Sequence, residues 1–268
     1  MRRTLLAAGA AAVFWTLPAA AQHPEHTHEH GEVHSHRGPG PHFIDAFFTE
    51  NAYIERKVRP DLLASIEEGS RRYTAHLEVE WALHPDISII VHAPAHHLVR
   101  DGLPAETGLG DISVGPKVAV LNDRSAFILS LGADLELGTG DESRGLGEGH
   151  SALAPFLLAW IPFGKERRAL LQTALHVGFP LAAGHEAHGE ASAALSWTSP
   201  LGLTPILEGI VEFGFEGEET DWAVAPEFRW EFAPAWELGA GAKIRVSGPG
   251  EEKLRLTVGA IRHFPLPR

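Results

Sequence analysis

Apolar and polar residues alternate along most of the chain after residue 70, and this period of two constrains the fold more than any other feature. In residues 73–83, Tyr73, Leu77 and Trp81 belong to one set of alternate positions, and Glu78 and Glu80 belong to the other. Side chains two residues apart share a face of a β-strand, so such a segment has one apolar and one polar face. The pattern returns at residues 112–120, 127–137, 171–181, 191–197, 203–215, 222–232, 236–246 and 254–260.

The lengths of these segments and of the links between them predict a membrane-spanning barrel. Each segment has roughly ten residues, which suits a tilted strand across a bilayer. Short links (residues 84–86, 122–124, 162–167, 199–202 and 233–235) alternate with longer ones (residues 95–108, 138–149, 182–189, 216–221 and 247–252). Outer-membrane barrels have this asymmetry of turns and external loops. With a first strand at residues 52–58 and an external loop to Ser70, the sequence predicts an all-β, antiparallel barrel of about 12 strands.

Composition is compatible with this fold and excludes several others. The mean hydropathy of −0.06 excludes a bundle of transmembrane helices, but it suits strands whose two faces differ. With 35 acidic and 22 basic residues, the chain lacks the positive charge that nucleic-acid binding needs. The absence of cysteine excludes disulfides and thiolate metal sites. A soluble periplasmic β-sandwich or closed barrel remains an alternative, because it also has two-faced strands.

The first 21 residues have the layout of a secretory signal peptide. Arg2 and Arg3 precede an apolar run from Leu5 to Leu17, and Ala19 to Ala21 supply small residues for cleavage. The run is too short to span a bilayer. We therefore expect export and a location in the outer membrane, with residues 22–44 as a leader and residues 45–268 as the barrel.

The predicted leader is rich in histidine and has almost no residues that could form a core, so we expect it to be disordered without a ligand. Neutral imidazoles bind Zn²⁺, Cu²⁺ and Ni²⁺, and closely spaced histidines can share one ion. No cofactor is required by this interpretation. The candidate metal ligands are His23, His26, His28, His30, His34, His36 and His42.

The polar faces of the predicted strands provide candidate lumen residues. In a barrel whose outer face is apolar, the charged face lines the interior. The predicted lumen-lining residues are His76, Glu78, Glu80, Asp134, Glu136, His176, Glu208, Glu212, Glu227, Arg229, Lys243 and Arg245. Tryptophans near strand ends are expected to form interfacial girdles; they are Trp81, Trp160, Trp197, Trp222, Trp230 and Trp236.

The segment from Gly108 to Lys117 (GLGDISVGPK) resembles a strand signature of a bacterial outer-membrane barrel family. This "transporter"-type family is related to barrels of the phenol meta-degradation pathway. The segment from Asp45 to Asn51 (DAFFTEN) resembles the residues before the first strand in such proteins. The resemblance implies an outer-membrane channel or a transport-associated barrel, and it carries over no catalytic residues.

The sequence offers no convincing catalytic group, so we do not expect an enzyme. His150 and Ser151 are adjacent, and neighbours on a strand point to opposite faces. His185 and His188 are three residues apart in a glycine-rich loop, whereas the helical zinc-protease motif needs a spacing of four. His92 lies at the start of another predicted external loop.

Three functions therefore remain open. The first is a channel for small solutes that is linked to divalent transition-metal ions by the leader, with acidic lumen residues favouring cations. The second is a barrel for uptake of hydrophobic or aromatic compounds, and the third is a soluble periplasmic metal-binding protein. The expected partners are outer-membrane lipid, metal ions or small solutes, and periplasmic transport proteins.

Overall fold

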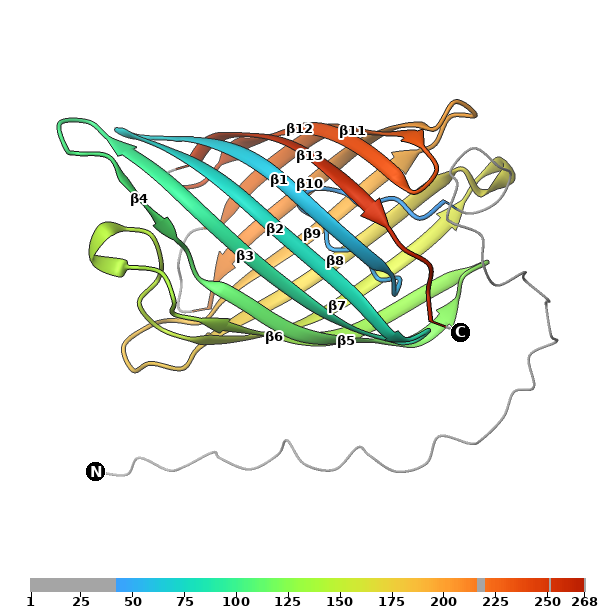
Figure 1. Cartoon of the computed structure of the whole chain (residues 1–268), viewed down its shortest axis with the longest axis horizontal. Helices are drawn as coiled ribbons and strands as arrows, with labels where there is room; N and C mark the ends of the chain where they lie inside the picture. Colours follow the sequence, from blue (N-terminus) through green and yellow to red (C-terminus); the bar gives the residue numbers. More distant parts are fainter. Residues whose placement is uncertain (1–41, 216–219, 251, 268) are drawn as a thin grey trace, which may run out of the picture. The chain divides into compact units, whose positions relative to one another are not determined.

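The computed structural model describes residues 42–215, 220–250 and 252–267, and these residues form a closed antiparallel β-barrel (Figure 1). The strands are β1 (Arg56–Glu67), β2 (Ser70–His84), β3 (Ile87–Arg100), β4 (Glu106–Leu109), β5 (Ile112–Asp123), β6 (Phe127–Leu137), β7 (Ala152–Phe163), β8 (Ala169–Pro180), β9 (His188–Trp197), β10 (Leu203–Gly214), β11 (Asp221–Ala233), β12 (Trp236–Ser247) and β13 (Glu252–His263). Two short 3₁₀ helices, η1 (Glu142–Arg144) and η2 (Lys165–Arg167), lie in links.

Apart from β4 and β5, strands that follow each other in sequence pair with each other, and the pairing of β1 with β13 closes the barrel. The short β4 pairs with residues 95–98 of β3, and β5 pairs with residues 87–92 of the same strand. Because β4 and β5 follow each other along one edge of β3, they act as a single interrupted strand. The predicted antiparallel barrel of about 12 strands is thus confirmed.

The two ends of the barrel differ in their links, as the sequence predicts for most of the chain. One end has tight turns such as Pro85–Asp86, and it also holds the start of β1 and the end of β13. The other end has longer links, including residues 138–151 and 181–187. We call these the short-turn end and the long-loop end.

The expected first strand at residues 52–58, with a loop to Ser70, is wrong. The first strand instead covers Arg56–Glu67, and it joins β2 through only Glu68 and Gly69. Gly69 has a φ of 70°, which glycine adopts without strain in a two-residue hairpin. The expected long link at residues 95–108 is also shorter, because β3 continues to Arg100 and β4 begins at Glu106.

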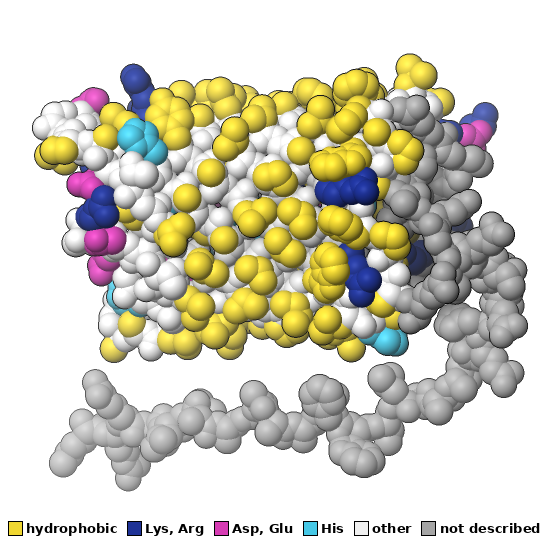
Figure 2. Space-filling view, in the orientation of Figure 1, with side chains coloured by type: hydrophobic (Ala, Val, Ile, Leu, Met, Phe, Trp, Pro, Cys, Tyr) yellow, Lys and Arg dark blue, Asp and Glu magenta, His cyan; other side chains and the backbone are white. Residues whose placement is uncertain are grey.

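The outer surface of the barrel is an apolar band. Hydrophobic side chains cover the wall of the barrel, and most charged side chains visible in this view lie toward its ends (Figure 2). Leu62, Leu131, Leu195 and Val258 are examples, and each is 45% exposed or more. A soluble protein rarely exposes so large an apolar area, whereas a barrel in lipid requires it. This surface is evidence against the soluble β-sandwich.

Aromatic side chains contribute to this outer surface near the strand ends, with one exception among the predicted tryptophans. Trp81, Trp197, Trp222, Trp230 and Trp236 are all at least 40% exposed. Trp160 is fully buried inside the barrel, so its expected place in an interfacial girdle is wrong. No helix in the described part of the chain is long and apolar enough to cross a membrane.

Candidate functional site

Residues 42–55 precede β1 and fold back into the barrel, where they close off its short-turn half; we call them the plug segment (Figure 1). Ile44, Ala52, Tyr53 and Ile54 are each at most 1% exposed. They pack in one cluster with inward side chains of the strands. The predicted barrel domain begins at Asp45, but His42 is already buried with the plug segment.

Aromatic contacts hold the beginning of the plug segment against β7. The rings of Phe43 and Trp160 are stacked, with centroids 4.8 Å apart and planes only 3° from parallel. Tyr53 meets Phe43 edge-on at 5.0 Å. Such pairs stabilise a structure beyond the area that they bury. Trp160 is inside the barrel because the plug segment gives it an apolar partner there.

The backbone of the plug segment is irregular, so its buried polar groups need partners from the barrel wall. The Arg229 Nε donates to the carbonyl of Asp45 at 2.7 Å. The Arg124 side chain donates to the carbonyl of Ile54 at 2.8 Å. These hydrogen bonds replace those that a strand would make with its neighbours.

Two glutamates hold consecutive backbone amides of the plug segment. The Phe47 N–H donates to Glu227 Oε2 at 3.0 Å, and the Phe48 N–H donates to Glu208 Oε1 at 3.1 Å. Both carboxyl groups are buried. Each therefore acts as a fixed acceptor that determines where Phe47 and Phe48 lie.

A buried ion network joins the plug segment to β1 and β2. The Lys57 Nζ lies 3.1 Å from Asp45, 2.8 Å from Glu55 and 2.8 Å from Glu78. Arg59 also reaches Glu78, at 3.3 Å. Burial raises the pKa of the Asp45 carboxyl, and the nearby charge of Glu55 raises it further. The positive charge of Lys57 therefore stabilises three buried carboxyl groups at once.

A second lysine anchors the other end of the plug segment. The Lys117 Nζ lies 2.8 Å from Glu80 Oε2 and donates to the backbone carbonyl of Asn51 at 3.1 Å. The Ser88 hydroxyl donates to the other oxygen of Glu80 at 2.7 Å. Lys117 is fully buried, so this cation depends on these contacts.

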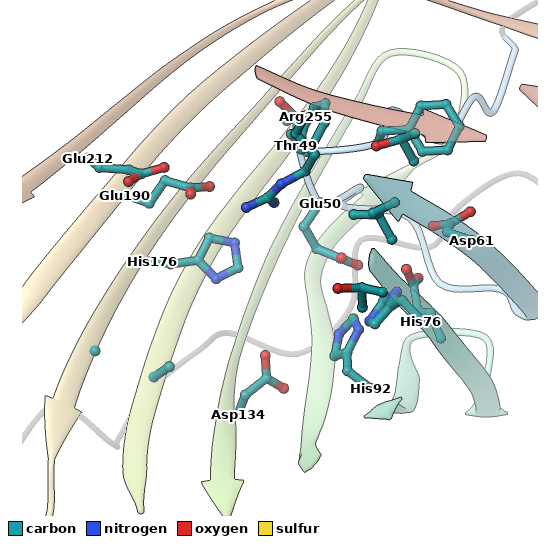
Figure 3. Close-up of a pocket in the computed structure, with 18 of the residues that line it drawn as sticks. Thr49, Glu50, Asp61, His76, His92, Asp134, His176, Glu190, Glu212 and Arg255 are labelled. Atoms are coloured by element: carbon teal, nitrogen blue, oxygen red, sulfur yellow. The ribbon is translucent and has the colours of Figure 1, made fainter. Parts of the chain in front are cut away.

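Between the plug segment and the long-loop end lies a cavity of about 930 Å³. The cavity is lined by strands from around the barrel and by plug residues such as Thr49 and Glu50, and Figure 3 shows side chains from both. Among the described residues that line it, 12 are acidic, three are Arg and five are His. The three arginines are Arg59, Arg72 and Arg255, and each lies close to a carboxylate. The cavity is therefore strongly acidic.

The structure places the predicted lumen residues on the inner side of the barrel in three groups. Those that line the cavity are His76, Glu78, Asp134, Glu136, His176 and Glu212. Those that bind the plug segment are Glu208, Glu227 and Arg229. Of the remaining three, Glu80 pairs with Lys117, Lys243 pairs with Glu212, and Arg245 lines a smaller neighbouring cavity. Their contact with a passing solute stays a prediction.

Most predicted metal ligands of the leader lie outside the described residues, and His42 is the exception. Among the residues that the structure does describe, no group of three or more His, Asp or Glu side chains has the spacing of a metal site. His92, which the sequence places at the start of a loop, lies in β3 and lines the cavity.

Sequence reasoning missed the plug segment and the ion network around Lys57. One signal was available: Lys57, Arg59 and Asp61 alternate with Val58, Pro60 and Leu62, the two-faced pattern of a strand. This pattern would have placed the first strand correctly. It would not have shown that the preceding residues enter the barrel.

Comparison with solved structures identifies the same fold in outer-membrane channels. An outer membrane channel from Pseudomonas putida F1 superposes with a TM-score of 0.63 at 13% sequence identity, covering 83% of this chain and all of that one. The KdgM porin gives a TM-score of 0.54 at 11% identity, covering 77% and 99% of the two chains. The NanC porin gives 0.53 at 10% identity, covering 76% and 99%. At such low identity the likeness concerns the fold.

No curated protein matches the sequence. The family model described as "Putative MetA-pathway of phenol degradation" matches residues 91–251, which is more than half of the chain. This agrees with the resemblance found at Gly108 to Lys117. The chain belongs to this family of putative phenol-degradation MetA-pathway proteins.

Proposed function

We propose that the protein is an outer-membrane channel for small solutes that prefers cations and is closed in this structure by its plug segment. The observation that carries the proposal is the acidic cavity, which opens toward the long-loop end and has the plug segment at its base. Rings of carboxylates in a pore favour cations over anions. The apolar outer band and the fold shared with channels and porins support the membrane location.

Passage requires the plug segment to move, because its side chains pack tightly in the short-turn half. The segment precedes the first strand and is covalently attached only at Arg56 within the described residues. Besides its apolar packing, the segment contacts the wall through hydrogen bonds and ion pairs, which can exchange with water. It can therefore leave or shift without any break in the pairing of the strands.

Planar-bilayer conductance tests this function. We expect the purified protein to conduct in brief openings with a reversal potential that indicates cation preference. Deleting residues 42–50 should increase the conductance and keep the preference. Absence of conductance in both proteins, or anion selectivity, would disprove the proposal.

Charge variants make the selectivity test sharper. Glu190 and Glu212 are paired across β9 and β10 on the inner wall, and both line the cavity. Replacing both by Gln should reduce the cation preference, because both acidic groups are removed from the pathway. As a matched control, Glu166→Gln removes a charge from a link at the short-turn end and should leave the selectivity unchanged.

We further propose that the histidine-rich leader binds divalent transition-metal ions near the channel. The support is chemical, since histidines such as His26, His28 and His30 are ligands suited to Zn²⁺, Cu²⁺ and Ni²⁺. Calorimetry with these ions should give a binding signal that falls when residues 22–41 are deleted. Equal signals from the two proteins would refute this part of the proposal and leave the channel function standing.

Uptake of hydrophobic or aromatic compounds is a second candidate, and one observation favours it. A shallow apolar recess of about 490 Å³ lies in the wall formed by β1, β2, β3 and β13, lined by residues that include Leu62, Tyr73 and Ala95. An uptake assay with an aromatic substrate distinguishes this function from cation passage. If this second function is correct, uptake of the aromatic substrate should be faster with the protein than without it. The double variant of Glu190 and Glu212 should not change that rate.

A further inference from the structure

Two histidines of adjacent strands lie side by side on the wall of the cavity. The rings of His76 on β2 and His92 on β3 are stacked, with centroids 5.3 Å apart and planes 16° from parallel. They are diagonal neighbours, because His92 is paired with Glu78 and His76 is paired with Pro94. Both line the cavity, and Figure 3 shows them beside each other.

A carboxylate from the other side of β5 faces the same space. Asp134 on β6 is only 9% exposed, and its Oδ1 atom has no hydrogen-bond partner among the described residues. Figure 3 shows its side chain directed into the cavity on the side of His92. A buried carboxylate oxygen without a partner is costly, and the charge of a cation held by the neighbouring imidazoles would offset part of that cost.

Glycine on the strand between His92 and Asp134 makes space for the Asp134 carboxylate itself. Gly115 of β5 lies at this level, and a Cβ atom there would collide with Asp134 Oδ1 and with the backbone of Ala133. Glycine thus allows the Asp134 carboxylate to lie against β5. Because Gly115 has no side chain, nothing from this position lies between Asp134 and the imidazoles of His76 and His92.

We propose that His76 and His92 bind a divalent transition-metal ion from the cavity, with Asp134 balancing its charge. Imidazole nitrogens are preferred ligands of Zn²⁺, Cu²⁺ and Ni²⁺. A carboxylate close to the ligating imidazoles commonly accepts a hydrogen bond from a ligand or from bound water. Glu50 of the plug segment lines the same cavity and adds negative charge.

This site has two protein ligands, and water completes the coordination of the ion. Such a site binds the ion weakly, and weak binding suits a channel. An ion in transit must bind well enough to enter and weakly enough to leave. This agrees with the finding that the described residues contain no set of three ligands at metal spacing. The inference rests on the proposed cation channel and names one class of ion that it takes.

Residue-resolved chemical modification tests the site without depending on conduction. Diethyl pyrocarbonate modifies neutral imidazoles, and mass spectrometry of the full chain reports each histidine separately. We expect Zn²⁺ to slow the modification of His76 and His92. Mg²⁺, which prefers oxygen ligands, should not slow it. Exposed His84 and His97, on the same two strands, serve as internal controls with little protection.

Variants show whether the two histidines act together. In His92→Gln, the protection of His76 should disappear, and in Asp134→Asn the Zn²⁺ concentration for half-protection should rise about tenfold. Unchanged protection of His76 in His92→Gln would overturn the proposal, as would equal protection by Mg²⁺. If Zn²⁺ protects the histidines but the protein does not conduct, the metal site is supported and the channel function is refuted. If the protein conducts but Zn²⁺ gives no protection, the channel function is supported and the metal site is refuted.

Discussion

Phe43 lies flat against Trp160 inside the barrel, with ring centroids 4.8 Å apart. The two residues come from the plug segment and from β7, so this stack links the movable part of the structure to the fixed wall. Trp160 is fully buried only because Phe43 and its neighbours cover it. The stack is therefore a direct measure of whether the plug segment is docked.

Phe43→Ala should loosen the plug segment and leave the barrel intact. The stacking contributes about 0.5–1.5 kcal/mol beyond the apolar area that is buried, so open periods in bilayer recordings should become several-fold more frequent. Phe163→Ala is the matched control, because Phe163 lies on the outer face of the same strand and is 44% exposed. An unchanged open probability in Phe43→Ala would contradict this role of the stack.

The hydrogen bond from the Phe47 N–H to Glu227 makes a second prediction. In Glu227→Leu the buried amide loses its acceptor, which should destabilise docking by about 1–3 kcal/mol. In Glu227→Gln the side-chain carbonyl can still accept, so the effect should be smaller.

Cysteine labelling measures this effect, because the chain has no cysteine of its own. Ala46→Cys places a single thiol at a site that is 2% exposed. Its reaction with a maleimide should be fastest with Leu at position 227, slower with Gln and slowest with Glu. Equal rates for all three proteins would show that this hydrogen bond does not hold the plug segment.

Arg229→Lys should weaken docking although it keeps the positive charge. The Arg229 guanidinium lies over the Phe47 ring at 3.7 Å while its Nε donates to the carbonyl of Asp45. Lysine cannot make both contacts with the same geometry, and the loss should be about 1–2 kcal/mol. Labelling of Ala46→Cys should accelerate accordingly. Arg245→Lys, away from the plug segment in the smaller cavity, should leave the labelling rate unchanged.

Lys57→Met should destabilise the folded barrel itself. The substitution leaves the carboxyl groups of Asp45, Glu55 and Glu78 buried without their shared cation, which typically costs about 3–5 kcal/mol. Heat-modifiable gel mobility should show unfolding at a lower temperature. Lys253→Met removes an exposed ion pair with Glu68 and should change stability by less than about 1 kcal/mol. Similar unfolding temperatures for both variants would rule out a structural role of the buried network.

The regular strands could be predicted because their signal is local. Alternation over residues 127–137 predicts a strand, and β6 covers Phe127–Leu137. An outward residue contacts lipid and an inward residue contacts water or polar groups. Apolar and polar residues therefore alternate along the sequence of each strand. This holds for most of the barrel.

The plug segment could not be predicted in the same way, because its contacts are distant in sequence. Asp45 meets Arg229, and Ile54 meets Arg124, and no short pattern contains these pairs. The plug segment also removes the apolar–polar alternation from the strands against which it packs. Where it packs, inward residues such as Leu158 and Trp160 are apolar, so β7 loses its alternation. The incorrect assignment of Trp160 to the outer surface follows from this.

The position of the plug segment immediately before β1 has a consequence for assembly. The barrel is closed by the pairing of β1 with β13, so the seam of the wall joins the first and the final strand. A segment attached to the start of β1 is therefore held at the short-turn mouth of the finished wall, and it can fold into the interior through that end without any strand leaving its partner. Sealing the wall and filling it are thus separable steps of assembly.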